Sequence, residues 1–510
     1  MRTNIFLQLS PWAAASLLHR ASRLGLALVP FALLGCHGSS SLTVSSDRGP
    51  SPFISLVHLS GPGLGAVAGV AYTIAAKPGS VSKPVHVAYS IAALTTRGYA
   101  AGQTITVPVF GLYAGYDNQV SMEIMRQFGD PFRLEVDITT DPYVDPTGIY
   151  SQPDIVVKRA AASSLGFDFI YIKSSLGSPI ILDTDGEIRW AAPGPSDSLA
   201  SAFVGDAFVI GGVKKPIMQR LSLDGSFSQA DLPPGDYTDF NHDIDDGKNG
   251  LLAELDASIG GIPAIESNIV ELRGVPTPMI MKRWDLAAII GDYMTSQGDD
   301  AAAFVRPGVD WFHTNSAIYD PSDDSIIVSS RENFVIKLDY STGAIKWILG
   351  DPTKYWYTFP SLRAKALTLA PGGLYPVGQH GLSITPDGLL MLFNDGYGSL
   401  NQPAGQSGGQ TRTYSAVSAY SIDPASMSAQ EVWRYDAGQT IYSAICSSAY
   451  ESADKSVLVD YSVADNMTQA ILVGLNPNHD IVFQFDYPTS GCSTSWNARP
   501  FPLDDLSITQ

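Results

Sequence analysis

The stretch Ile181-Leu-Asp-Thr-Asp-Gly-Glu-Ile-Arg-Trp190 shows the pattern on which the fold of this chain depends. It is an apolar strand, a turn of Asp and Gly, and a second strand that ends in an aromatic residue, as in a β-hairpin. Lys337-Leu-Asp-Tyr-Ser-Thr-Gly-Ala-Ile-Lys-Trp347 repeats the pattern. Longer or weaker copies occur at Ser421 to Trp433, Gly474 to Phe485, Val270 to Trp284 and Arg220 to Phe227.

These copies make six repeats. Five steps from Asp183 to Asn476 span 293 residues, or about 59 residues per repeat. That length fits four antiparallel strands with their turns, and radial repetition of such units is a β-propeller. We therefore predict an all-β protein whose residues 155–510 form a six-bladed β-propeller. The alternative is a stack of hairpins in two sandwiches.

Composition agrees with many short strands. The 510 residues include 47 Gly and 34 Pro, which favour turns, and 45% are hydrophobic, as in a globular protein. The formal net charge is −19. Because neutralisation of phosphates supplies most non-specific affinity for nucleic acid, this charge argues against a nucleic-acid partner.

Residues 51–150 have a different texture from the repeats. Apolar and polar residues alternate in four short stretches, Val85 to Ile91, Thr104 to Phe110, Val120 to Ile124 and Phe132 to Ile138. Alternation with a period of two is typical of half-buried strands, so we predict a small N-terminal β-sandwich domain. The Pro-containing stretch from Pro142 to Asp154 is expected to be a linker.

Residues 1–36 have the pattern of an export signal. Arginines precede or flank an apolar run, Leu24 to Leu34, that is too short to span a bilayer. The run ends Leu33-Leu34-Gly35-Cys36, which resembles a bacterial lipobox and predicts lipidation of Cys36. Residues 37–50, which are rich in serine, are expected to be a tether, so that the lipid is the sole membrane contact. An ordinary cleaved signal with an incidental cysteine is the alternative.

Two further cysteines, Cys446 and Cys492, remain if Cys36 carries a lipid. An exported compartment permits disulfide bonds, and two remaining cysteines are an even number. A bond between Cys446 and Cys492 is therefore one prediction. Two buried free thiols are the other.

Three of the eight histidines recur at one place in successive repeats. His242, His313 and His380 each open the strand that precedes the second apolar strand of a repeat, with spacings of 71 and 67 residues. The first strand of a propeller blade lines the centre, so we expect the three imidazoles to converge there. Asp256, Arg331 and Asn394 align at the ends of the strands that follow.

Two other interpretations of these histidines must be weighed. Some propellers carry a structural histidine in each blade, although here only three blades have one. Three histidines also suit zinc, although the nearby Arg331 would place a cation beside a divalent metal. A propeller that binds a ligand or protein without catalysis, or a metal-dependent propeller enzyme, therefore stays an alternative.

The segments around the histidines resemble those of the bacterial arylsulfate sulfotransferases. Asp310-Trp-Phe-His-Thr-Asn-Ser316 and Tyr319-Asp-Pro-Ser-Asp-Asp-Ser-Ile-Ile-Val-Ser-Ser-Arg331 form the most specific block. Gly378-Gln-His380 and Phe393-Asn-Asp-Gly396 resemble the nucleophile segment, although the family more often has Asp-Asn in the latter. Val107 to Tyr113 resembles a motif of the N-terminal β-domain.

This resemblance covers residues from about 50 to the C-terminus. It implies a six-bladed propeller with an N-terminal β-domain, often dimeric and periplasmic. The implied reaction transfers a sulfuryl group from one phenol to another without adenylylated sulfate, metal or diffusible cofactor. The expected partners are therefore phenols and aryl sulfates, with a possible second copy of the chain. The disulfide common to some members has no counterpart near residues 350 to 370.

The resemblance also implies roles for individual residues. His380 matches the nucleophile that becomes sulfohistidine, and the residues matching the sulfate site are His242, His313, Asn315 and Arg331. A neutral imidazole can attack sulfur, and a guanidinium offers planar donors to two sulfate oxygens. We expect His242 to be the general acid and base and His313 to donate to the developing negative charge.

Overall fold

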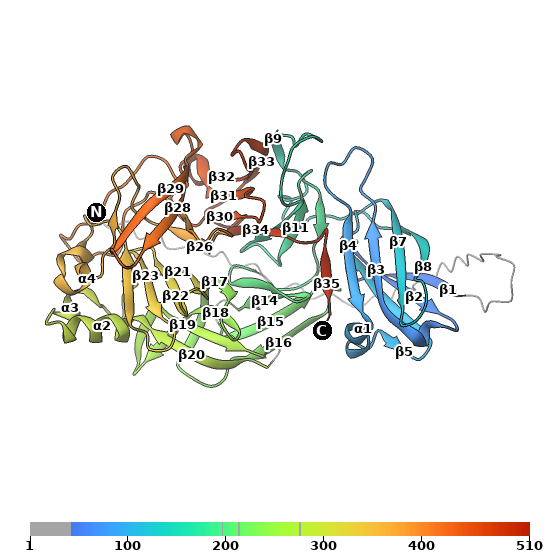
Figure 1. The fold of residues 1–510 in the computed structure, drawn as a ribbon, viewed down its shortest axis with the longest axis horizontal. Helices are drawn as coiled ribbons and strands as arrows, with labels where there is room; N and C mark the ends of the chain where they lie inside the picture. Colours follow the sequence, from blue (N-terminus) through green and yellow to red (C-terminus); the bar gives the residue numbers. More distant parts are fainter. Residues whose placement is uncertain (1–41, 196, 213–214, 275–276, 510) are drawn as a thin grey trace, which may run out of the picture. The chain divides into compact units, whose positions relative to one another are not determined.

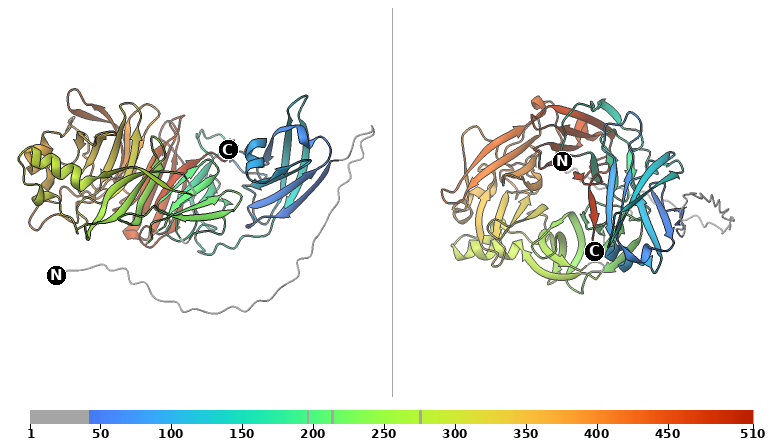
Figure 2. Two further views of the ribbon diagram at one scale, coloured as in Figure 1. Left: turned by 90° about the horizontal axis from the view of Figure 1, so that it is seen from below. Right: turned by 45° about the vertical axis from the view of Figure 1, so that its right-hand side comes forward.

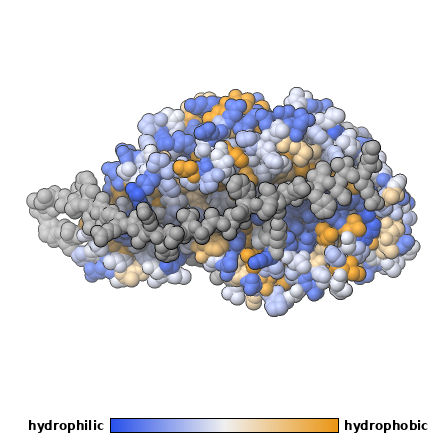
Figure 3. All heavy atoms as spheres, turned by 180° about the vertical axis from the view of Figure 1, so that it is seen from behind, coloured by the Kyte–Doolittle hydropathy of each residue, from blue (hydrophilic) through white to orange (hydrophobic). Residues whose placement is uncertain are grey.

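The computed structural model describes residues 42–195, 197–212, 215–274 and 277–509 (Figure 1). The expected export signal and lipidation site Cys36 lie outside these residues. Within the described residues, no helix is long and apolar enough to cross a membrane. On the face drawn in Figure 3, apolar side chains occur in separate patches between polar ones.

The N-terminal part consists of two sheets. The first has the order β1-β2-β6-β5, and the second has the order β35-β4-β3-β7-β8. Their strands are β1 (Thr43–Arg48), β2 (Ile54–Ser60), β3 (Val67–Ile74), β4 (Val85–Ser90), β5 (Ala100–Ala101), β6 (Thr104–Phe110), β7 (Asp117–Arg126), β8 (Phe132–Thr139) and β35 (Leu506–Ile508). Buried and more exposed residues alternate along β4 and β7, as the sequence pattern predicts. A 3-10 turn, η1 (Leu64–Ala66), and helix α1 (Ile91–Thr96) complete this part.

Two expected boundaries differ from the structure. Residues Thr43–Arg48, expected within the tether of residues 37–50, form β1 and pair antiparallel with β2. Backbone pairing explains this, because a polar, β-branched stretch is a good edge strand even when it buries little side-chain surface. Near the other end, Leu506–Ile508 pairs in parallel with β4 instead of joining the repeats. The N-terminal sheet therefore contains a strand from the end of the chain.

Within the described residues, six further sheets follow one another along the chain and form a β-propeller, named here blades 1 to 6 (Figure 2). Blade 1 has β34 (Asn497–Phe501), β10 (Phe169–Lys173), β11 (Ile180–Asp183) and β12 (Ile188–Trp190). Blade 2 has β13 (Ser201–Val204), β14 (Ala207–Gly211), β15 (Ile217–Ser222) and β16 (Phe227–Asp231). Blade 3 has β17 (Tyr237–Asp246), β18 (Leu251–Ile259), β19 (Ile262–Arg273) and β20 (Met279–Asp285).

The remaining blades follow the same plan. Blade 4 has β21 (Thr314–Asp320), β22 (Ser325–Ser330), β23 (Val335–Asp339) and β24 (Ile345–Leu349). Blade 5 has β26 (His380–Ile384), β27 (Leu390–Asn394), β28 (Ala416–Asp423), β29 (Ser428–Tyr435) and the short β25 (Thr368–Leu369). Blade 6 has β30 (Ser448–Glu451), β31 (Val457–Val463), β32 (Gln469–Leu475), β33 (Ile481–Pro488) and β9 (Asp154–Val157).

The predicted repeats coincide with the outer hairpins of these blades. The hairpin quoted first, Ile181 to Trp190, is β11 with β12, and Lys337 to Trp347 lies in β23 with β24. First strands of successive blades contact one another, from β13 through β17, β21, β26 and β30 to β34. Blade 1 takes its first strand from residues Asn497–Phe501, so the end of the chain closes the ring. The predicted all-β propeller class is confirmed.

Short helices lie mainly between blades 3 and 5. Asp285 caps α2 (Leu286–Ser296) by accepting a hydrogen bond from the backbone N–H of Ala288. Buried Leu286, Ile290 and Met294 recur every four residues, which is the apolar stripe that packs on the core. The other short helices are α3 (Ala301–Phe304), η2 (Tyr355–Thr358), α4 (Pro360–Arg363), η3 (Ala437–Gln439) and α5 (Ala464–Met467).

One of the two predictions for the cysteines is confirmed. Cys446 and Cys492 form a disulfide that joins residues 46 apart in sequence. Both are buried with Val463 in a small apolar cluster, against which Ile445 and Trp496 pack. The bond ties the entrance of blade 6 to the segment that leads into β34.

Candidate active site

The three recurring histidines meet at the centre of the propeller. His242 lies in β17, His313 directly precedes β21, and His380 is the first residue of β26. The ring centroid of His242 lies 4.9 Å from that of His313 and 6.4 Å from that of His380. The predicted convergence of the imidazoles is therefore present, from first strands of three consecutive blades.

An irregularity in the strand pairing accompanies each histidine. In β17, residues 241–243 lie between the paired residues Phe240 and Ile244 and face Glu254 alone. The pairing also shifts beside His313, between Thr314 and Ser316, and beside His380 before Ser383. Such bulges bend a strand and re-aim a side chain, which explains how a first strand can direct a histidine into the centre.

The imidazole of His380 is buried and held through one nitrogen. Its Nδ1 lies 2.6 Å from Oδ2 of Asp395 and 2.9 Å from the carbonyl oxygen of Gly378. Because the carbonyl can only accept, this network assigns a proton to Nδ1. The lone pair is then on Nε2, the nitrogen that a nucleophile would use.

Electrostatics keep His380 uncharged. Burial lowers the pKa of His380 well below its ordinary value, and the positive charge of Arg331 lowers it further, as do His242 and His313. At neutral pH this imidazole is therefore neutral, which is the state required for attack on sulfur.

His313 is in the opposite state. Its Nδ1 lies 2.6 Å from Oδ2 of Asp310 and 2.6 Å from Oε2 of Glu266. Burial favours a lower pKa for His313, but the two carboxylates outweigh burial and raise that pKa to about 10. His313 is thus an imidazolium at neutral pH. Its backbone has a φ of +55°, and the preceding Trp311 and Phe312 anchor it because they are buried in the core.

His242 lies between the other two imidazoles. Its Nε2 is 3.3 Å from Oε2 of Glu266, an ion-pair distance, and neither ring nitrogen has a hydrogen-bond partner among the described residues. The indole of Trp496 stacks on the ring at a centroid distance of 5.0 Å and an angle of 19°. Stacking on Trp496 therefore fixes the orientation of this imidazole.

Arg331 follows β22 directly and is only 2% exposed. Its backbone N–H donates to the carbonyl of His313 at 3.0 Å. Its Nη1 donates to Oε1 of Glu332 at 2.9 Å, whereas Nε and Nη2 are buried without a partner among the described residues. Buried donors without partners are costly, so they point to an anionic ligand such as sulfate.

The other aligned residues differ in what they contact. Asn315 is buried, and its Nδ2 donates to the carbonyl of Gln379 at 2.7 Å, while its Oδ1 has no partner among the described residues. Asn315 was expected to donate a hydrogen bond to sulfate. One of its two amide N–H bonds is instead used to connect blades 4 and 5. Asp256 accepts from Asn241 and from the backbone of Glu266, and Asn394 accepts from the backbone of Val377. Those two residues stabilise local backbone.

A metal-binding arrangement is also present. His242, Glu266 and His313 each offer one ligand atom, and within the described part of the chain these atoms lie within 4.8 Å of one another. Two imidazoles and a carboxylate are a ligand set that suits zinc. The same contacts suit an ion-pair network, because Glu266 and Asp310 both contact Nδ1 of His313.

Several site residues were missed by sequence reasoning. Asp310 and Asp395 stood in quoted motifs but were given no role, although a carboxylate near a histidine is the usual orienting partner. Glu266 lies in β19, 24 residues after His242, and Trp496 precedes β34 at the end of the chain. No sequence signal connects these two with the histidines, because the pairing of strands within blade 3 brings Glu266 near His242, and closure of the ring by β34 brings in Trp496.

The fold and the site define a β-propeller protein with a central cluster of histidine, arginine and carboxylate side chains. Residues 155–497, more than half of the chain, match the arylsulfotransferase (ASST) family, and the chain belongs to that family. The resemblance seen in the sequence is thereby confirmed.

Two curated relatives share part of this sequence. The arylsulfate sulfotransferase AssT of Escherichia coli O6:H1 is 34% identical over 175 residues, which are 31% of this chain and 28% of that protein. The AssT of Lelliottia amnigena is 30% identical over 197 residues, which are 35% of this chain and 31% of that protein. The chain thus matches less than a third of the length of either relative.

Among solved structures, the Cps50 (Swd1) β-propeller domain of Myceliophteria_thermophila covers 66% of this chain and all of that domain. It is 10% identical with a TM-score of 0.35, which is too low to support an argument.

Proposed function

We propose that this protein transfers a sulfuryl group from a phenolic sulfate ester to a phenol through a sulfohistidine at His380. The arrangement that carries the proposal is the neutral His380 beside a buried guanidinium with two donors free. Burial and Arg331 together hold the pKa of His380 down, so the nucleophile is unprotonated where an anion would bind. No metal or diffusible cofactor enters the proposed steps.

In the first half-reaction, Nε2 of His380 attacks sulfur and forms the N–S bond. The bond from sulfur to the aryl oxygen breaks, and the electron pair leaves with that oxygen. His242 donates a proton to the departing phenolate, while Arg331 and the imidazolium of His313 stabilise the sulfate oxygens. Charge on equatorial oxygens makes positioning and electrostatics the main sources of catalysis, as in phosphoryl transfer.

In the second half-reaction, the oxygen of an acceptor phenol attacks the same sulfur. The N–S bond breaks and its electron pair returns to Nε2 of His380. The phenol proton passes to His242, which restores the starting state. His242 suits this role because its Nδ1 has no hydrogen-bond partner among the described residues, and its Nε2 lies 3.3 Å from Oε2 of Glu266, a carboxylate that can stabilise the protonated ring.

Initial rates against donor and acceptor test the covalent route. A sulfohistidine requires the donor phenol to leave before the acceptor attacks, so reciprocal plots should give parallel lines. The sulfuryl group trapped from a chromogenic aryl sulfate should be released by acid. Intersecting lines would mean direct transfer between two bound phenols, and His380 would then be a general base.

A metal-dependent propeller enzyme is the second candidate. The close approach of ligand atoms from His242, Glu266 and His313 is the observation in its favour. Turnover of an aryl sulfate with and without a chelator separates the two candidates. Turnover that survives removal of metal supports the sulfohistidine route, and turnover that is lost and then restored by zinc supports the metal.

We further propose that the protein works in the periplasm as a lipoprotein anchored through Cys36. The disulfide between Cys446 and Cys492 is compatible with an oxidising compartment. Labelling of expressing cells with a palmitate analogue should mark the wild type and leave Cys36→Ser unlabelled. Equal labelling of both would contradict the anchor.

A further inference from the structure

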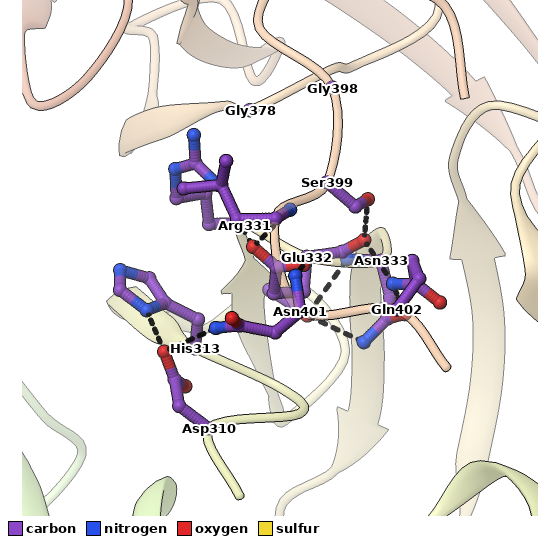
Figure 4. Close-up of polar contacts among 12 residues, drawn as sticks. Asp310, His313, Arg331, Glu332, Asn333, Gly378, Gly398, Ser399, Asn401 and Gln402 are labelled. Carbon is purple, nitrogen blue, oxygen red and sulfur yellow. Dashed lines mark hydrogen bonds and ion pairs between the residues drawn. The ribbon is translucent and has the colours of Figure 1, made fainter. Parts of the chain in front are cut away.

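Glu332, which follows Arg331, is a fully buried carboxylate at the centre of a hydrogen-bond network (Figure 4). Its Oε1 accepts from Nη1 of Arg331 at 2.9 Å and from the backbone N–H of Leu400 at 3.0 Å. Its Oε2 accepts from the backbone N–H of Asn401 at 2.7 Å. Both oxygens are therefore satisfied by donors from two blades.

These bonds decide which side of the guanidinium stays available. Glu332 takes Nη1, and the two nitrogens that remain without a partner among the described residues are Nε and Nη2 of Arg331. These nitrogens are adjacent, and their parallel N–H bonds match two oxygens of a tetrahedral anion. If the side chain of Arg331 were rotated, the guanidinium would present a different pair of nitrogens to the anion.

Glu332 also holds the segment Ser399–Gln402, which is part of the connection between β27 and β28. Besides the two backbone bonds to Glu332, Ser399 and Gln402 donate to the carbonyl of Glu332. The side chain of Asn401 then donates to Oδ2 of Asp310 at 3.0 Å, and Asp310 contacts His313 (Figure 4). One network thus reaches both cations of the site.

Positive groups compensate the buried carboxylate. Nζ of the buried Lys354 donates to the carbonyls of Arg331 and Glu332 at 3.3 and 3.1 Å. Burial lowers the pKa of Arg306, and the charge of Glu332 offsets part of that lowering. Arg306 also donates to the carbonyl of Asn401. Glu332 is accordingly an integral part of a charged network, which is the usual condition for a buried ionised group.

We propose that Glu332 is a positioning residue that holds Arg331 with its Nε and Nη2 toward the sulfuryl group. This inference rests on the proposed function, because it assigns the anion that Arg331 binds. Glu332 itself makes no contact with substrate in this scheme. It acts through the orientation of Arg331.

The test is a double-mutant cycle between Glu332→Gln and Arg331→Lys. In Glu332→Gln, the NH2 group of the amide would face either Nη1 of Arg331 or a backbone N–H group. Two hydrogen-bond donors would then face each other, and the hydrogen bond at that position would be lost. We expect kcat/KM for an aryl sulfate to fall about 10–100-fold in Glu332→Gln, the usual range for residues that orient a functional group. Because the effect passes through Arg331, the same change made in Arg331→Lys should lower kcat/KM less than about twofold further.

Two variants control for folding. Glu271→Gln changes another fully buried carboxylate, one that contacts Asn249 and Tyr340, and should keep kcat/KM near that of the wild type. Glu332→Asp retains the charge but shortens the reach to Arg331, so it should also lose activity. A native kcat/KM in Glu332→Gln, or equal losses with and without Arg331, would overturn the proposal.

Binding of inorganic sulfate, measured by calorimetry, separates this proposal from the proposed function. Weaker sulfate binding in Glu332→Gln, with no turnover of aryl sulfates by the wild type, would retain the role of Glu332 and reject the transferase. If the wild type is active, and Glu332→Gln binds sulfate and turns over aryl sulfates as the wild type does, only the role of Glu332 is rejected.

Discussion

His313 and His380 occupy equivalent places in consecutive blades, yet their protonation states are opposite. Two carboxylates, Asp310 and Glu266, contact Nδ1 of His313 and raise its pKa to about 10. His380 has one carboxylate, Asp395, and the pKa of His380 is lowered by burial and by Arg331. The same side chain at equivalent positions of two repeats is therefore an imidazolium in one blade and a neutral imidazole in the next.

The difference shows that position in the repeat determines where a histidine points, while its neighbours determine its chemistry. The neighbours come from other elements: Glu266 lies in β19 of blade 3, and Arg331 follows β22 of blade 4. In the proposed reaction the cation stabilises negative charge and the neutral ring attacks. Variants that remove either imidazole, or exchange its environment, should separate these roles.

Removal of the neutral imidazole should have the largest effect. His380→Ala leaves no nucleophile for the covalent route, so we expect turnover to fall by about 10⁴-fold or more. Rapid mixing with an aryl sulfate should release no burst of phenol. His58→Ala, which changes a histidine of the N-terminal sheet that contacts Asp47 and Thr106, should keep the burst. A normal burst from His380→Ala would refute the assignment of the nucleophile.

Arg331→Lys should have the next largest effect. Lysine keeps a positive charge near His380 but cannot present two parallel N–H donors. Loss of a preorganised donor typically costs about 10²–10³ in rate, and the retained charge should recover part of this. Steady-state kinetics with an aryl sulfate measure kcat/KM. A near-native value would show that Arg331 is a fold residue or only attracts the anion.

Glu266→Gln should convert the environment of His313 toward that of His380. Loss of one carboxylate should lower the pKa of His313 by about 1–3. Because we expect the protonated ring to be the active form, activity should begin to fall at a lower pH on the alkaline side. The acid side, where protonation of His380 stops attack, should stay well below pH 6.5. A pH–rate profile measures both limbs, and an unmoved alkaline limb would contradict the role of His313.

The disulfide should matter least to activity and more to stability. Replacing Cys446 and Cys492 together with alanine releases a 46-residue loop, which should cost about 2–4 kcal/mol in the free energy of unfolding. Trp496 packs on this cluster and stacks on His242, so we also expect a loss of turnover smaller than in Arg331→Lys. Thermal unfolding and kcat test this, and an unchanged Tm would contradict it.

Sequence reasoning anticipated much of this site because a repeat makes equivalent positions comparable. The alignment of His242, His313 and His380 predicted their convergence, and the ring distances agree. Sequence reasoning did not anticipate that the amide of Asn315 would donate a hydrogen bond to the carbonyl of Gln379, because that contact joins two blades. The β1 strand was also missed, since its stability comes from pairing with β2 and little from its own side chains.

By itself, the sequence determined the all-β repeats, the outer hairpins and the three histidines at matching places, because periodic patterns and turn residues are local properties. The chemistry of those histidines depends on contacts that form when the chain folds. Glu266 and Trp496 contact these histidines from separate elements, and β34 closes the ring with residues Asn497–Phe501. Protonation depends on charges within a few ångströms in a poorly solvated interior, and only folding creates that proximity.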